Sequence, residues 1–231
     1  MMTSLTAWWS AAPSLPAPWL TQLGMSTLWG LVLSWGAVMV ALRLWPGLQG
    51  RGRWALVLAV MVLSWWPGMA SPTYWLGLSF QSPSLVLGLV AGYGLWVRML
   101  PAAGQPGPWV ARGSQVTWLC VLGIVLGWVL LLDTLALWPR SVYAAGFNPA
   151  ALVALALVLV ALALWHAGLP VVLLAAVLLL FAITRLPSGN VWDALSDPLL
   201  WVGLHFKLMR DVLAHRRAKS TPPNYAVSSS G

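Results

Sequence analysis

The sequence predicts an all-α fold, a polytopic bundle of transmembrane helices, and three observations carry that prediction. The chain of 231 residues is 60% hydrophobic and only 7% charged, whereas soluble domains carry about 25% charged residues. Two long apolar runs, Ala150–Trp165 and Val171–Ile183, are joined by a short turn. Both runs are apolar on every face, as is typical of helices in lipid. Most of the 18 Trp residues flank apolar runs, the usual place of Trp at membrane interfaces.

The charge balance argues against a nucleic-acid partner. The net charge is +8, and the four acidic residues are all Asp. A nucleic-acid surface would need clustered Lys and Arg on a soluble face, and such a cluster occurs only in residues 205–231. Cationic residues with few acids are expected in the cytoplasmic loops of a membrane protein. Cys120 is the only cysteine, which excludes an intrachain disulfide and a thiolate metal site.

Residues 1–25 are predicted to form an uncharged irregular or interfacial tail. They contain three prolines and no basic residue, so they do not match a secretory signal. Met25 directly precedes the first apolar run, which leaves Met1 and Met25 as alternative natural starts. At the other end, residues 214–231 are predicted to be basic and then disordered.

The transmembrane bundle is predicted within residues 26–213. Its first six spans cover about 26–44, 54–66, 83–99, 115–138, 150–165 and 171–183. The uncharged segment 67–82 is too short to span and is predicted to form an interfacial or re-entrant helix. A residue that can cap a helix precedes a proline, which marks a helix start, at Ser71, Ser82, Asn148 and Asp197.

The segment Val191–Met209 decides between seven spans and six. If it spans, ten of the twelve Lys and Arg residues share one side, and only Arg140 and Arg185 lie on the other. That bias favours seven spans, with the N-terminus outside and the C-terminus in the cytoplasm of a bacterial-type inner membrane. If the segment instead lies flat as an amphipathic helix, the division is seven against five. Such a helix would have one apolar face, formed by Leu195, Leu199, Val202, Phe206, Met209 and Leu213.

Charged residues at membrane depth are costly and are therefore candidates for function. In the seven-span arrangement the candidates gather at the outer face: Asp133, Arg140, Arg185, Asp193 and Asp197. Asp133 is expected to pair with Arg140 or Arg185, with a proton relay or substrate contact as the alternative. Asp193 and Asp197 would share a face of a continuous helix and could bind a cation or act as acid and base. Both also suit helix N-termini, and capping is the favoured interpretation.

No cofactor or metal is expected. His166 and His205 lie near the predicted inner face, and two histidines on different helices can hold a b-type haem. The sequence has no metal-ligand cluster and no phosphate-binding loop. Ordinary interfacial histidines are therefore the favoured interpretation of both residues.

Three functions fit these observations. The favoured one is a non-enzymatic accessory, assembly or scaffold component, with the lipid bilayer and other membrane subunits as partners. The second is a small transporter with a polar site near Asp133, since discontinuous helices often line binding sites. The third is an outer-face enzyme acting on a lipid-linked substrate through Asp193, Asp197 and Asp133, with Arg140 or Arg185 as an anion clamp.

Overall fold

The computed structural model describes residues 15–99, 113–137, 139, 141–165 and 168–220, and in these ranges the protein is all-helical, without strands. The longer helices are α2 (Pro18–Leu44), α3 (Gly50–Trp65), α5 (Leu85–Met99), α6 (Gly113–Thr134), α8 (Pro149–Trp165), α9 (Leu169–Thr184) and α11 (Pro198–Ser220). The shorter ones are η1 (Gly68–Ala70), α4 (Pro72–Phe80), α7 (Val142–Ala145) and α10 (Val191–Leu195). Two helices, Pro18–Leu44 and Thr117–Thr134 within α6, are long and apolar enough to cross a membrane. The helices α5, α8 and α9 are apolar but shorter.

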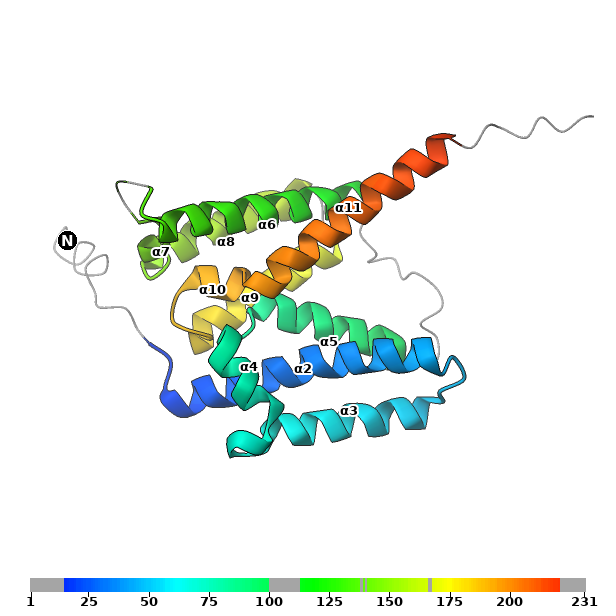
Figure 1. Cartoon of the computed structure of the whole chain (residues 1–231). Helices are drawn as coiled ribbons and strands as arrows, with labels where there is room; N and C mark the ends of the chain where they lie inside the picture. The colour runs from blue at the N-terminus through cyan, green and yellow to red at the C-terminus, as the bar shows by residue number, and fades with distance from the viewer. Residues whose placement is uncertain (1–14, 100–112, 138, 140, 166–167, 221–231) are drawn as a thin grey trace, which may run out of the picture.

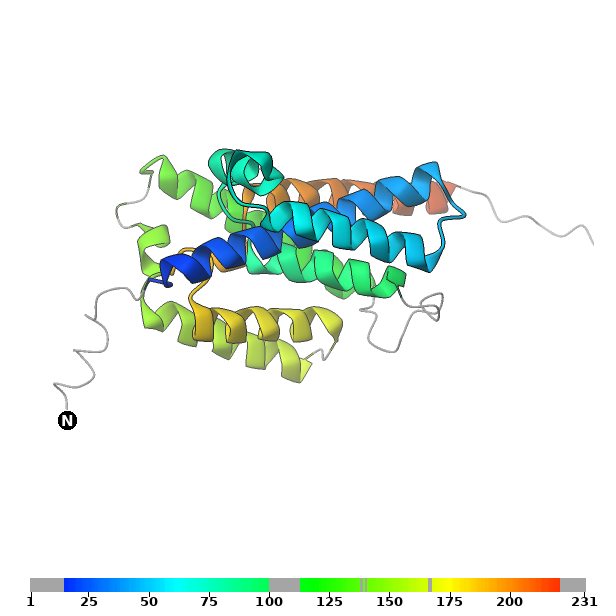
Figure 2. The same cartoon turned by 90° about the horizontal axis from the view of Figure 1, so that it is seen from below.

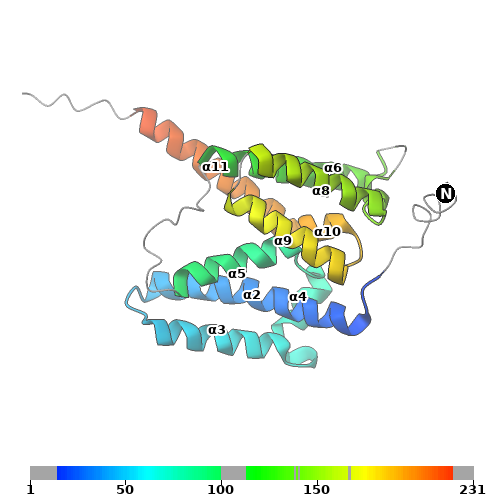
Figure 3. The same ribbon diagram turned by 180° about the vertical axis from the view of Figure 1, so that it is seen from behind.

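The long helices run side by side, and α11 crosses them obliquely (Figure 1). Helices α2, α3 and α5 pack on one another at one side of the molecule, and α9 packs on α5. The pair α6–α11 and the pair α8–α9 lie on the other side, as the view from behind also shows (Figure 3). In the view from below, α11 and the pair α8–α9 lie on opposite sides of α2 and α3 (Figure 2). The short helix α10 lies between the two sides and contacts both α5 and α9.

Helix α2 connects two buried apolar clusters. Leu28 of α2 packs with residues of α5, α9 and α10 in the first cluster, which includes the fully buried side chains of Val177 and Phe181. Val38 of α2 packs with Val57 of α3 and with the end of α5 in the second cluster. The helix begins at Pro18 rather than near Ser26, because proline fits the first helical turn, where its missing N–H is not needed.

The segment Val191–Met209, which the seven-span prediction counts as one crossing, is not one continuous helix. Helix α10 ends at Leu195, Ser196 has extended backbone angles, and α11 starts anew at Pro198. The helix then continues to Ser220, so the start of the predicted disordered tail is helical, while residues 221–231 lie outside the described part. Asp193 and Asp197 consequently sit on different helices.

A second interruption separates α4 from α5. The short helix predicted within residues 67–82 is present, and its cap is as expected, since Ser71 Oγ accepts the amide of Thr73 at 3.2 Å. The next cap is Ser84 rather than Ser82, because Ser84 Oγ accepts the amide of Leu87 at 3.1 Å. Between the two helices, Gln81 has a left-handed φ of 61°. The indole N–H of Trp29 donates to the Gln81 carbonyl at 2.8 Å, which fixes this turn against α2.

Helix α11 packs on α6 through two glycines. A Cβ on Gly123 would lie 2.6 Å from Leu204 Cδ1, and one on Gly127 would lie 2.2 Å from Trp201 Cδ1. Small residues four apart let helices approach closely, and here they admit Trp201, whose Nε1 donates to the carbonyl of Ile124 at 3.1 Å. The contact at Gly127 therefore depends on the absence of a side chain, because a Cβ there would meet the rigid Trp201 ring, whereas the flexible Leu204 side chain can move away from Gly123.

We expect Gly127→Ala to destabilise the protein by about 1–3 kcal/mol, the usual cost of forcing extra volume into a packed contact. Unfolding by denaturant in mild detergent, followed by circular dichroism, measures this change. Gly203→Ala is the control, since a Cβ on that α11 residue meets no atom within 4 Å; it should change stability by at most about 1 kcal/mol, in the stabilising direction. Equal stability of the two variants would contradict the described packing.

Candidate functional site

Asp133 lies in the last turn of α6 and holds the start of α7. Its carboxylate accepts the hydroxyl of Ser141 at 2.8 Å and the amides of Val142 and Tyr143 at 3.0 and 2.8 Å. The chain can turn back in this way because α6 ends at Thr134, earlier than the predicted Trp138, and Ala136 adopts a left-handed φ of 54°. Asp133 is thus used as a helix cap.

The expected ion pair between Asp133 and Arg185 does not form. Arg185 is the C-cap residue of α9, with a left-handed φ of 58°, and its guanidinium lies over the ring of Phe181 at 5.4 Å. Within the described ranges, the salt bridges involve only Asp211, with Lys207 and Arg210. Arg140, the other expected partner of Asp133, lies outside the described residues.

Tyr143 connects α7 to Asp193 in α10. Its hydroxyl donates to Asp193 Oδ2 at 2.8 Å, and the hydroxyl of Ser188 donates to the same oxygen. Burial and the hydrogen bond to the Asp193 carboxylate raise the pKa of Tyr143 to about 12. The phenol therefore stays protonated at neutral pH and acts as a donor. We call Asp133, Ser141, Tyr143, Ser188, Asn190 and Asp193 the end cluster.

Asn190 is the fully buried centre of the end cluster. Its Nδ2 donates to the carbonyl of Tyr143 at 2.9 Å, and its Oδ1 accepts the amide of Trp192 at 3.0 Å. A Cβ on Gly146 would lie 1.9 Å from that Oδ1, so the position admits only glycine. The sequence analysis missed Asn190, although Asn190 and Asp193 have the spacing of residues that cap a helix start.

Asp197 caps two helices at once. Its Oδ1 accepts the amide of Leu200 in the first turn of α11 at 2.9 Å, which confirms the predicted cap. Its Oδ2 accepts the amide of Ser84 at 2.8 Å, and Ser84 is itself the cap of α5. One carboxylate therefore lies at the positive ends of two helix dipoles. Asp193 and Asp197 do not form a shared pair, because one is bound to α7 and the other to α5.

Of the two histidines considered as haem ligands, the structure describes His205. His205 Nδ1 lies 2.8 Å from the carbonyl of Trp201, four residues earlier in α11, and its ring stacks edge-on with the Trp201 ring. His166 lies outside the described residues. Among the residues that are described, no three His, Cys, Asp or Glu side chains are grouped as a metal site would require.

An apolar groove of about 400 Å³ runs along α8 beside the end cluster. Alanines form much of its wall, and Trp192 closes one side. The only amide side chain in its lining is that of Asn148, whose Oδ1 accepts the amide of Ala150 at 2.9 Å and so caps α8, as predicted. The groove thus offers apolar contact rather than polar groups for chemistry.

Comparison with known proteins gives no assignment. No protein-family model matches the chain. A search of curated proteins finds no match, and a search of solved structures finds none either.

We expect Asp197→Ala to destabilise the protein by about 1–4 kcal/mol, because it removes acceptors from two helix starts and one cap is worth about 0.5–2 kcal/mol. The stability of Asp197→Asn should lie between those of the wild type and Asp197→Ala, since its single side-chain carbonyl oxygen can accept only one of the two amides. Asp211→Ala in the same helix is the control. It removes a partly exposed ion pair to Lys207 and should cost less than about 1 kcal/mol. A loss no larger than that of the control would contradict the double cap.

Proposed function

We propose that the protein is a multi-pass inner-membrane protein that serves as a non-enzymatic accessory, assembly or scaffold component. The observation that carries the proposal is the use of its carboxylates. Asp133 and Asp197 accept backbone amides at helix starts, and Asp193 accepts the hydroxyls of Tyr143 and Ser188. These groups connect helices, which is a structural task. The partners would be the lipid bilayer and other membrane subunits.

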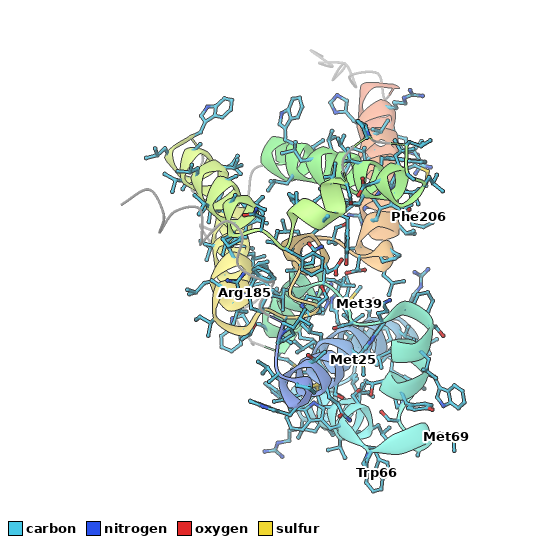
Figure 4. The ribbon with its side chains drawn as sticks, turned by 90° about the vertical axis from the view of Figure 1, so that its left-hand side faces the viewer. Met25, Met39, Trp66, Met69, Arg185 and Phe206 are labelled. Atoms are coloured by element: carbon cyan, nitrogen blue, oxygen red, sulfur yellow. The ribbon has the colours of Figure 1, made fainter. Side chains whose placement is uncertain are left out.

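Membrane embedding is supported by the apolar side chains on the outside of the helices. Helix α8 has no buried residue, and Leu164 near its end is 85% exposed. Ile183 of α9 is 72% exposed. Trp66, Met69 and Phe206 lie at the periphery of the molecule (Figure 4). Soluble monomers rarely expose contiguous apolar patches of this kind, whereas lipid would cover them.

The distribution of charge supports a cytoplasmic C-terminus. Helix α2 ends, α3 begins, and α5 and α11 end toward one end of the molecule (Figure 1). The cations in these parts of the helices are Arg43, Arg51, Arg53, Arg98, Lys207, Arg210, Arg216 and Arg217. The end cluster lies at the opposite end, with α7 and α10 (Figure 1). Positive residues are enriched on the cytoplasmic side of a membrane protein.

Seven crossings remain our proposal, the seventh being α10 and α11 together. Helix α11 packs along α6 through Trp201 and Leu204. A helix lying flat on the membrane surface would meet a crossing helix near its end, whereas Gly123 and Gly127, which these two side chains contact, lie near the middle of α6. The packing therefore favours the seven-span arrangement over six spans with an interfacial helix.

A small transporter is the second candidate, and a specific observation favours it. Two interrupted helices, α4–α5 and α10–α11, meet where Asp197 accepts the amide of Ser84. Transporters often bind substrate where discontinuous helices meet. The site would then lie at Asp197 rather than near Asp133. The enzyme hypothesis is not carried forward, since Asp193 and Asp197 face different elements.

The chain purified in gentle detergent from its native membrane should carry stoichiometric membrane-protein partners, detected by cross-linking and mass spectrometry. The same chain reconstituted alone in liposomes should move no solute. Solute flux by the isolated wild-type chain would contradict the scaffold proposal and support the transporter if Asp197→Asn abolished the flux. Asp211→Asn is the control and should keep the flux.

A further inference from the structure

Two arginines at the cationic end are fixed in place by backbone carbonyls. Arg53 in the first turn of α3 donates from Nε to the carbonyl of Leu48 at 2.9 Å and from Nη1 to the carbonyl of Arg98 at 3.0 Å. Arg98 in the last turn of α5 donates from Nη1 to the carbonyl of Gly94 at 2.9 Å. The Arg53 guanidinium therefore lies at the end of α5, and the carbonyls that hold the two guanidinium groups, those of Arg98 and Gly94, are about one helical turn apart.

These hydrogen bonds use only some of the N–H donors of the two guanidinium groups. A guanidinium has five N–H donors in a planar fork, and the carbonyls use Nε and Nη1 of Arg53 and Nη1 of Arg98. In the described part of the chain, no carboxylate pairs with either residue, since the salt bridges involve only Asp211. Two neighbouring positive charges are thus held by neutral carbonyls, without an anion to balance them.

We propose that Arg53 and Arg98 form a binding site for a phosphate group, supplied by the headgroup of an anionic lipid. The guanidinium fork matches the oxygens of a phosphate and can bind two of them together. Because the side chains are already fixed, binding loses little side-chain entropy. Basic sites between membrane helices on the cytoplasmic side are suited to anionic headgroups.

An apolar stripe beside Arg53 favours a lipid over a free anion. Trp54, Leu58 and Val62 follow at intervals of four residues along α3 and are each 50–60% exposed. Residues four apart lie above one another on a helix, so these three residues form a stripe along α3. The stripe begins one residue after Arg53 and lies about 100° around the helix from it. An acyl chain attached to a bound headgroup would lie on this stripe. The choice of a lipid as the source of the phosphate rests on the proposed membrane embedding.

The test compares two double variants that remove the same charge from the same end. Arg53→Gln with Arg98→Gln removes the proposed site, whereas Arg43→Gln with Arg51→Gln removes two exposed arginines nearby. Native mass spectrometry of the purified full chain would measure binding of phosphatidylglycerol and of phosphatidylcholine with matched acyl chains. We expect the first pair to weaken phosphatidylglycerol binding about tenfold, the effect of losing a charge-assisted hydrogen bond. The control pair should weaken it less than about twofold, and phosphatidylcholine binding should not change.

Further measurements distinguish the ways in which the proposal can fail. Arg98→Gln alone keeps both bonds of Arg53 and should still weaken phosphatidylglycerol binding about threefold, even if the double variant does not fold. Equal losses in the two double variants would overturn the site in favour of net charge. Displacement of the lipid by millimolar inorganic phosphate would overturn a lipid as its ligand. If the wild-type protein is found outside the membrane fraction, the proposed function is contradicted. If it is found in membranes and the two double variants lose phosphatidylglycerol binding equally, only this inference is contradicted.

Discussion

The carboxylate of Asp197 determines where two helices of this protein begin. It accepts the amide of Ser84 before α5 and the amide of Leu200 in α11, at 2.8 and 2.9 Å. The first amides of a helix have no partner within the helix, and a buried amide without a partner is costly. One side chain thus serves two helix starts that are distant in the sequence. Because Asp197 joins these two starts, α11 begins against α5 and then packs on α6.

The end cluster applies the same chemistry at other helix ends. Asp133 holds the start of α7, and Tyr143 links α7 to Asp193 in α10. Asn190 fills the space that Gly146 leaves open. Three of the four acidic residues in the chain therefore connect helices through hydrogen bonds. This structural use of the carboxylates is the main reason to prefer a scaffold to an enzyme, since an acid–base site needs a carboxylate that is free to exchange protons with a substrate.

The apolar runs alone were sufficient to predict most of the helices, and the Ser71, Asn148 and Asp197 caps could be predicted from the proline that follows each. Helix α7 could not be predicted, because four residues carry little periodicity and its start depends on Asp133, which precedes it in another helix. The helix start at Asp197 could be expected from the proline that follows it, but the hydrogen bond from Ser84 to its carboxylate could not, because Ser84 lies far away in the sequence. The link between Tyr143 and Asp193 is likewise a contact between distant segments, and neither residue type signals it locally.

We propose that α10 and α11 together form a seventh crossing, which places the C-terminus on the cationic side. Single cysteines at Arg51, Leu137 and Arg216, introduced with Cys120→Ala and labelled by a membrane-impermeant maleimide in intact bacterial cells, test it most directly. The account predicts labelling of the cysteine at position 137 in intact cells, and labelling at positions 51 and 216 only after the membrane is opened. Labelling at positions 137 and 216 together in intact cells would place α11 on the outer surface and contradict the claim.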